Sequence, residues 1–324
     1  MERTSASDIR VGRRVTLRDL QVLLAVAQFG SMAKAASHLS ITQPAVSQAV
    51  ANLERAFGAR LIDRGPRGAV LTRYGEAIQR RGMEVFDVLK QGSRDIEYLS
   101  DAGTGDVWIG ANEVLLGGFV PAVVQRLTEQ RSNIAVHALT VNTSDFDFAK
   151  LRERQLDLLL GRIMPQTDDD LNVETLFEEG LSVVVGQDSP WARRQKVALA
   201  ELADGPWIFG EPDNVVRSLI SKVFRDNGLD APRVSVVSVS MHLRLALLAT
   251  GKYFSTIPNS FVRYGVERWS LKILPIDLGL RLPVGIFTLK NRTLSPVALN
   301  FIKNVRSVAE SAAKNGDGFA KPRQ

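Results

Sequence analysis

The sequence predicts an α/β fold in two parts: a small helical N-terminal part, then a larger part in which strands and helices alternate. Three observations predict it. Between Thr16 and Phe57 apolar residues recur at helical spacing, and one long amphipathic pattern runs from Thr72 to about Leu99. From Asp106 onward, short apolar runs alternate with helical stretches, which is typical of open sheets with helices on both faces.

Composition limits the classes of protein. At 324 residues the chain should hold two or three domains. It has no cysteine, which excludes a disulfide framework, a thiolate metal site and a cysteine nucleophile. No apolar run approaches the length of a membrane span, and the N-terminus has no signal-peptide pattern. We therefore expect a cytoplasmic protein without a membrane partner.

The positive charge lies in the N-terminal part. Residues 10–81 hold 12 Lys/Arg against 4 Asp/Glu, whereas residues 82–324 hold 28 against 29. Although a charged run is often only a solvated face, this asymmetry favours contact with the phosphates of a nucleic acid.

The first helix is expected to begin at Thr16, with Asp19 in a capping-box position. Ser31 can cap a second short helix, Met32 to Leu39. A tight turn at residues 40–42 leads directly to a third helix. Two short helices joined by a tight turn match the helix-turn-helix pattern.

The third helix begins at Thr42, a suitable N-cap, and has Pro44 in its first turn. One face is apolar and predicts a core, whereas the other carries small, polar or basic groups that suit the DNA major groove. The apolar face consists of Val46, Val50, Leu53 and Phe57, and the outer face of Gln43, Pro44, Ser47, Gln48, Ala51 and Arg55. By periodicity alone, a helical hairpin with a solvated face fits equally well.

After this helix, two short apolar stretches flank residues 63–68, DRGPRG, which have the composition of a turn. They predict a hairpin with Arg64 and Arg67 near its tip. Beside a helix-turn-helix it is interpreted as the wing of a winged helix; the alternative is an ordinary surface hairpin.

Residues 30–75 also carry a family resemblance. This stretch resembles the DNA-binding domain of LysR-type transcriptional regulators. The resemblance lies in the sequence GSMAKAASHLSITQPAVSQAVANLERAFGARLIDR, followed by LTRYG. Ile62, where the family usually has Phe, and Met32-Ala33, in place of Phe-Thr, depart from it as packing changes. Together with the helix face and the wing, the resemblance implies a promoter-DNA contact set: Lys34, Thr42, Gln43, Pro44, Ser47, Gln48, Arg55, Arg64 and Arg67.

The long pattern from Thr72 to Leu99 predicts one helix with a heptad-like seam at residues 75, 78, 82, 85, 89, 92, 96 and 99. The seam includes Gly75, Gly82 and Gly92, and close approach of a partner helix would explain them. We expect a homodimer or homotetramer, in line with the family's linker helix. The alternative is a helix docked on its own domain. Residues 102–105, AGTG, are expected to form a hinge.

The remaining elements are predicted from the alternating pattern. Strands are expected at 107–110, 134–141, 156–160, 181–185, 206–209, 234–239, 253–258 and 286–289, and helices at 115–129, 146–154, 214–227, 241–249 and 295–309. This part resembles the family's effector-binding domain, which implies two lobes like those of a periplasmic binding protein. We expect DNA-binding residues 1–72, a linker at 73–105, lobe I at 106–178 and 284–312, lobe II at 179–283, and a disordered tail at 313–324.

A ligand cleft is expected at the carboxyl ends of the strands, where helix N-termini present free N–H groups. Arg162 could bind an anion there, or pair locally with residues 168–170, DDD, or with Glu113. A carboxylate at 113 would repel an anion unless it is neutralised. We expect a small anionic effector, an organic, aromatic or sugar acid, held by Asn112, Glu113, Thr143, Arg162, Phe209 and Ser240. Arg217 is a weaker anion candidate.

The sequence gives little support for catalysis. The three histidines lie far apart, and no phosphate-loop, zinc-spacing or nucleophile-elbow pattern occurs. We expect no cofactor, no metal and no enzyme activity.

The sequence is best interpreted as a DNA-binding regulator controlled by a small molecule, whose partners are promoter DNA, an effector, its own copies and RNA polymerase. Two other classes stay open: a regulator without a ligand, and an enzyme or small-molecule-binding protein with an accessory DNA-binding module.

Overall fold

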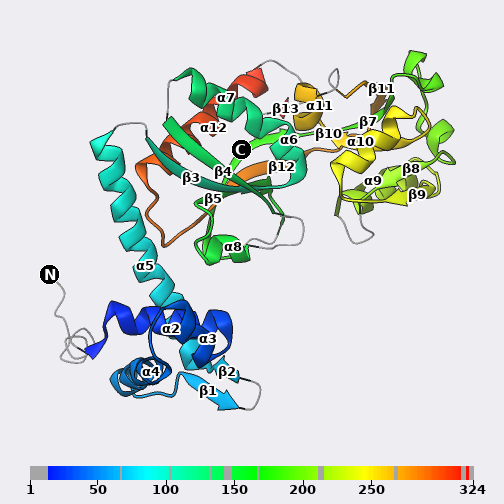
Figure 1. Cartoon of the computed structure of the whole chain (residues 1–324). Helices are drawn as coiled ribbons and strands as arrows, with labels where there is room; N and C mark the ends of the chain where they lie inside the picture. The colour runs from blue at the N-terminus through cyan, green and yellow to red at the C-terminus, as the bar shows by residue number, and fades with distance from the viewer. Residues whose placement is uncertain are drawn as a thin grey trace. The chain divides into compact units, whose positions relative to one another are not determined.

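The computed structural model describes residues 14–65, 68–101, 104–130, 133–141, 148–165, 168–210, 215–265, 269–314 and 319–320. The chain divides into two compact units, Met1–Ser93 and Arg94–Gln324, and the boundary falls inside the long helix α5 (Figure 1). The expected division instead placed this helix in a separate linker.

In residues 17–71, the first unit contains three short helices and a two-stranded hairpin before α5. These are α2 (Leu17–Phe29), α3 (Met32–His38), α4 (Gln43–Phe57), β1 (Ile62–Gly65), β2 (Gly68–Leu71) and α5 (Arg73–Ser100). Thr16, Ser31 and Thr42 cap the three short helices through side-chain oxygens.

The core of this unit is built from one face of each short helix. Leu23 of α2, Ala35 of α3 and Val50 and Leu53 of α4 are each fully buried in it. The small Ala35 lets the short helices pack closely. The expected inward face of α4 is therefore confirmed.

The first turns of α5 pack on this same core. A Cβ at Gly75 would lie 2.1 Å from the carbonyl oxygen of Leu61, and one at Gly82 would touch Leu24. Both glycines thus face their own unit, and Gly75 is required by the close approach of Leu61, which corrects the expectation that a partner helix explains them. A Cβ at Gly92 would meet nothing within 4 Å.

The second unit contains two sheets, each the centre of one lobe (Figure 1). The six-stranded sheet has the order β13-β6-β12-β5-β3-β4, and its parallel strands are β3, β4 and β5. Its elements are β3 (Thr104–Ala111), α6 (Glu113–Gly117), α7 (Phe119–Glu129), β4 (Asn133–Thr140), α8 (Ala149–Arg152), β5 (Leu158–Arg162), β6 (Leu171–Glu179), β12 (Leu282–Leu289), α12 (Pro296–Lys314) and β13 (Phe319–Ala320).

The five-stranded sheet has the order β11-β7-β10-β8-β9. Its lobe contains β7 (Leu181–Gly186), two 3-10 turns (Pro190–Arg193 and Leu199–Leu202), β8 (Trp207–Phe209), α9 (Val215–Asp226), β9 (Val234–Val237), α10 (Met241–Ala249), β10 (Phe254–Pro258), α11 (Asn259–Gly265) and β11 (Leu271–Asp277).

Helices cover both faces of each sheet, as predicted. In the first lobe, α7 and α12 pack on one face and α8 on the other. In the second, α9 packs on one face, and α10 and α11 on the other. The chain passes between lobes at Gly180 and again between β11 and β12.

Several predicted boundaries differ from the structure. The expected helix at 115–129 is two helices, α6 and α7, separated at Gly118, where a Cβ would lie 2.6 Å from the Ser260 carbonyl oxygen. β5 extends to Arg162, so this residue ends the strand rather than following it. Residues 313–314 belong to α12, and Phe319 and Ala320 pair with β6, so part of the expected tail is ordered.

Thr104 and Gly105, expected in the hinge, begin β3, while residues 102–103 lie outside the described part. Strands β6 and β11 and helix α11 had not been predicted.

Candidate nucleic-acid interface and ligand cavity

Helix α4 presents a polar outer face on the surface of the first unit. Gln43, Pro44, Gln48 and Arg55 are exposed, and Ser47 is half-buried. Thr42 is exposed and accepts a hydrogen bond from the amide of Ala45 at 3.4 Å, and Lys34 of α3 is exposed. This face is free of bulky apolar groups, as a helix that enters the major groove requires.

Three side chains on α4 form a hydrogen-bonded row. The Gln48 Nε2 donates to the Asn52 Oδ1 at 2.9 Å, and the Arg55 Nη2 donates to the same oxygen at 2.5 Å. Sequence reasoning missed Asn52, although its position four residues after Gln48 on the polar face was a usable signal. The row holds an amide and a guanidinium in fixed orientations at the surface.

The hairpin β1–β2 is tied to the end of α2. The amide of Ala69 donates to the carbonyl oxygen of Gly30 at 2.8 Å, and a Cβ at Gly68 would lie 2.4 Å from that oxygen. Arg64, on β1, is exposed. Arg67, the other arginine expected in the wing, lies outside the described residues.

The second unit contains a cavity of about 190 Å³ lined by residues of both lobes. Of the six residues expected in the ligand site, Asn112, Glu113, Arg162 and Phe209 line it. Ser240 instead caps α10, accepting a hydrogen bond from the amide of Leu243 at 3.4 Å, and is not among the described lining residues. Thr143 lies outside the described residues.

Glu113 joins the two lobes. It begins α6 of the first lobe, and its carboxylate accepts a hydrogen bond from the amide of Met241 at 3.0 Å and contacts His242 Nδ1 at 3.1 Å, both on α10. This carboxylate lies at the helix N-terminus, where negative charge is favoured. Its two oxygens are therefore engaged by the second lobe, which reduces the expected repulsion of an anion.

Arg162 pairs with a partner that the sequence did not suggest. Its Nη2 lies 3.8 Å from the Oε1 of Glu179, and both side chains are largely buried. Asp168 and Asp170, proposed as alternatives, pair with Arg152 instead. Burial lowers the pKa of Arg162, opposed by the charge of Glu179, and burial raises the pKa of Glu179.

Arg244 is a lining residue that sequence reasoning missed. It lies in the first turns of α10, and its Nη2 donates to the Ser255 Oγ at 2.6 Å and to the Thr256 carbonyl oxygen at 2.7 Å. A sequence signal was available, because Arg244 lies four residues after Ser240, a serine that can cap a helix and that follows an expected strand. Arg217, the weaker candidate, also lines the cavity.

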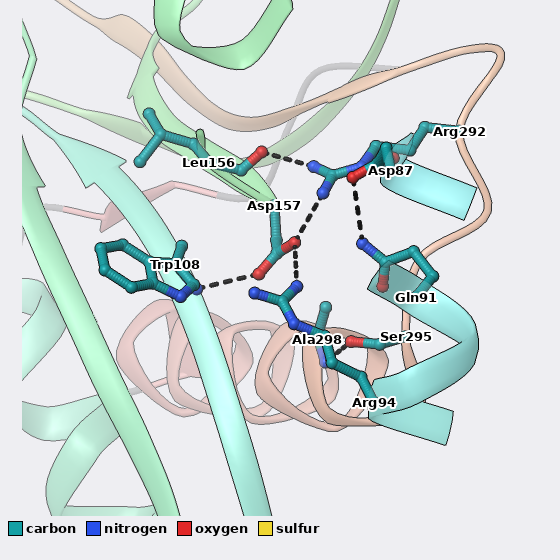
Figure 2. Close-up of polar contacts among 9 residues, drawn as sticks. All are labelled: Asp87, Gln91, Arg94, Trp108, Leu156, Asp157, Arg292, Ser295 and Ala298. Atoms are coloured by element: carbon teal, nitrogen blue, oxygen red, sulfur yellow. Dashed lines mark hydrogen bonds and ion pairs between the residues drawn. The ribbon is translucent and has the colours of Figure 1, made fainter. Parts of the chain in front are cut away.

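A buried ionic cluster fixes the start of β5 (Figure 2). The last residue of this strand, Arg162, lines the cavity. The Asp157 Oδ1 accepts hydrogen bonds from Arg94 and Arg292, each at 2.9 Å, and its Oδ2 accepts from the Trp108 amide at 2.9 Å. Arg292 also donates to the carbonyl oxygen of Leu156. This cluster joins the last turns of α5, β3 and the segment after β12.

Among the described residues no group of three His, Asp or Glu side chains could hold a metal ion. No described helix is both long and apolar enough to cross a membrane. The ring of His137 stacks on that of Trp108, with centroids 3.9 Å apart, and the ring of His38 lies 4.7 Å from that of Phe29.

Two protein-family models match this chain. The family model described as "Bacterial regulatory helix-turn-helix protein, lysR family" matches residues 17–76, and the model "LysR substrate binding domain" matches residues 100–310. The transcriptional regulator YdcI of Escherichia coli (strain K12) is 27% identical over 91% of this chain and 96% of its own length.

A second relative, the regulator GbpR of Azospirillum brasilense, is 26% identical over 95% of this chain and 91% of its own. Among solved structures, ArgP from Mycobacterium tuberculosis is 19% identical and superposes with a TM-score of 0.68 over 94% of this chain and 98% of its own, a likeness of fold.

The helix-turn-helix with its outer polar face, the two-lobed unit with a cavity between its sheets, and the two family models that match these two regions lead to one conclusion: the chain belongs to the LysR family of transcriptional regulators.

Proposed function

We propose that this chain binds promoter DNA through the outer face of α4 and the β1–β2 wing, and that a small anionic effector in the cavity controls it. The observation that carries the proposal is the pairing, in one chain, of an exposed polar recognition face with a cavity that contains three arginines. Chromosomal DNA as the target would place the protein in the cytoplasm.

The contacts with DNA are divided by type. Gln48, Asn52 and Ser47 can reach base edges, because Gln and Asn side chains pair well with adenine in the major groove. Lys34, Arg55 and Arg64, with Arg67, provide contacts to phosphates. Thr42, Gln43 and Pro44 lie at the helix N-terminus, which faces the groove in this motif.

Self-association is proposed to use the outer face of α5. Val85, Leu89, Ile96 and Leu99 are exposed, with 39, 51, 67 and 83% of their surface accessible. With the open position Gly92 they follow a 3-4 spacing, which is the pattern of a helix that pairs with another helix. Two paired chains would present two recognition helices to two half-sites.

An anionic effector fits the charges of the cavity. Arg162, Arg217 and Arg244 line it together with Glu113, the one carboxylate among its described lining residues, which already has partners in the second lobe. Because the effector would touch both lobes, it favours one lobe orientation, and this bias would pass to the DNA-binding units.

The DNA contact is tested with Gln48→Ala. DNA fragments selected by the wild-type chain from a random pool provide the specific ligand, and an unrelated fragment provides the non-specific one. We expect about a tenfold loss of specific affinity with unchanged non-specific affinity and Tm, corresponding to about 1–3 kcal/mol for a good base contact.

Gln21→Ala, at an exposed position of α2 outside the proposed contact set, is the matched control. Equal losses for Gln48→Ala and Gln21→Ala would contradict the assignment of α4 as the recognition helix.

A further inference from the structure

Two guanidinium groups from different lobes line the same cavity. Arg162 ends β5 of the first lobe, and Arg244 lies on α10 of the second. The positive charge of Arg162 lowers the pKa of Arg244, which shows that the two charges lie close enough to repel. An anion between them would remove that repulsion.

Arg244 has a fixed orientation and an unused donor. Its two hydrogen bonds to Ser255 and Thr256 hold the Nη2, while its Nε is buried and donates to no described residue. No carboxylate in the described part of the chain lies within ion-pair distance of it. Burial lowers the pKa of Arg244 to about 10, Arg162 adds to this shift, and Glu113 opposes it.

Arg162 also has an unused donor. Its Nε is buried without an acceptor among the described residues, and its pair with Glu179, at 3.8 Å, is longer than a charge-assisted hydrogen bond. A buried guanidinium N–H without an acceptor costs free energy. Two such groups, one in each lobe, mark a place for one acceptor.

The charges indicate that the acceptor is a monoanion. Among the described residues, three arginines, at 162, 217 and 244, face two carboxylates, Glu113 and Glu179, which leaves one positive charge in excess. Glu113 already occupies the N-terminus of α10 through the Met241 amide, so this helix end is not open to a second carboxylate.

The rest of the wall is largely apolar. Val141 of the first lobe, and Phe209 and Val239 of the second, contribute to it. The volume of about 190 Å³ is below the roughly 300–1,000 Å³ of most ligand pockets. Such a wall suits an apolar body, and its described uncharged polar residues, Asn112, Thr140 and Thr256, offer few partners to the many hydroxyls of a sugar acid.

We infer that the effector is a compact monocarboxylate with an apolar body, whose carboxylate bridges the Nε groups of Arg162 and Arg244 across the two lobes. This inference rests on the proposed function, and it narrows the anionic class to one charge type and one shape. It assigns Arg244 as a specificity-determining residue.

The test measures Tm shifts and calorimetric Kd values with the full chain. The probes are benzoate and isovalerate as compact monocarboxylates, benzamide as the uncharged analogue of benzoate, succinate as a dicarboxylate and gluconate as a sugar acid. We expect at least one monocarboxylate to raise the Tm and to bind at least tenfold more tightly than the other three. Tighter binding of succinate, gluconate or benzamide, or no monocarboxylate binding, would overturn the inference.

Arg244→Met should weaken the monocarboxylate at least tenfold, as expected for a lost hydrogen bond to a charged group. Arg225→Met removes a positive charge from an exposed position of α9 in the same lobe and should change nothing. If Arg244→Met fails to fold, Arg244→Lys, which lacks the Nε, should still weaken binding several-fold. The double variant Arg162→Met/Glu179→Gln, which removes the buried pair together, should match Arg244→Met.

Undiminished binding in the Arg244 variants would overturn the inference. DNA binding without a probe, measured on the same variants, separates the two proposals. If the chain still binds specific DNA but no monocarboxylate binds as expected, the inferred bridge between Arg162 and Arg244 is wrong and the proposed DNA-binding function is unaffected. If DNA binding itself is absent in the wild type, the proposed function fails.

Discussion

Single buried charges determine how the second unit is held together. Asp157 is 1% exposed and pairs with two arginines, Arg94 and Arg292, while it also accepts a hydrogen bond from the Trp108 amide. Both oxygens of this buried carboxylate accept hydrogen bonds. Disturbing it removes the negative charge that pairs with these two buried guanidinium groups.

We expect Asp157→Asn to lower the free energy of unfolding of the second unit by about 3–5 kcal/mol, because the variant removes the carboxylate charge shared by two buried ion pairs. Urea denaturation of the full chain, followed by tryptophan fluorescence, measures it. Asp168→Asn, in an exposed pair with Arg152, is the matched control and should cost no more than about 1 kcal/mol. Similar losses in the two variants would argue against the buried cluster.

Glu179 should make the stability of the second unit depend on pH. Burial raises its pKa above the ordinary value of 4.5, while Arg162 and Ser260 lower it. Between these two pKa values, the folded chain keeps a proton that the unfolded chain has released. The folded state therefore binds more protons, and the free energy of unfolding falls as pH rises through this interval.

Glu179→Gln removes this titration. Over the interval from about pH 4.5 upward to the raised pKa, we expect the Tm of the wild type to fall with pH relative to that of the variant. Scanning calorimetry at a series of pH values provides the comparison. A wild-type Tm that rises relative to the variant over the same interval would mean that the Arg162 charge outweighs burial.

At the scale of elements, the seam residues of α5 are packed on the first unit in the early turns of the helix and exposed in the later turns. Gly75, Ile78 and Gly82 pack on the core of the first unit, so the first part of the predicted seam is a docking surface for its own domain. The alternative of a helix docked on its own domain thus holds for these turns. From Val85 onward, the seam residues are exposed, and a Cβ at Gly92 would meet nothing within 4 Å.

Val85→Glu with Leu89→Glu should abolish self-association, because charges would be buried without partners in the proposed seam. Sedimentation equilibrium of the full chain measures it. Lys90→Glu, on an exposed face of the same helix away from the seam, makes the same change of two in net charge and should leave the association intact. If the double variant associates like the wild type, α5 is not the interface.

At the scale of the whole molecule, the positive charge and the polar recognition face belong to the same unit. Residues 10–81 carry 12 basic against 4 acidic residues, and the rest of the chain is nearly neutral. This asymmetry fits the proposed phosphate contact of the first unit, whereas the proposed anion site of the second unit would depend on a few local arginines.

Arg64→Ala should reduce the steepness of log affinity against log salt by about one unit if Arg64 neutralises one phosphate. The loss should be similar for specific and unrelated DNA, because phosphate contacts carry little sequence information. Fluorescence anisotropy at several salt concentrations measures both slopes. An unchanged slope would place Arg64 away from the DNA.

The sequence by itself determined the local features of this protein. Caps such as Thr16, Ser31 and Thr42, the inward residues of α4 and the exact span of α10 follow from side-chain chemistry within a few residues. The family resemblance likewise depends on motifs in one continuous stretch. Such features need no knowledge of distant segments, which is why they could be predicted.

Only the tertiary structure decided which distant charges meet. The Arg162–Glu179 pair, the contact of Glu113 with α10 and the lining position of Arg244 each join separate elements or lobes. The same holds for β13, a two-residue strand that is defined by its antiparallel pairing with the edge of β6. Periodicity reports burial along one element, whereas these contacts depend on how separate elements pack, and so no local pattern encodes them.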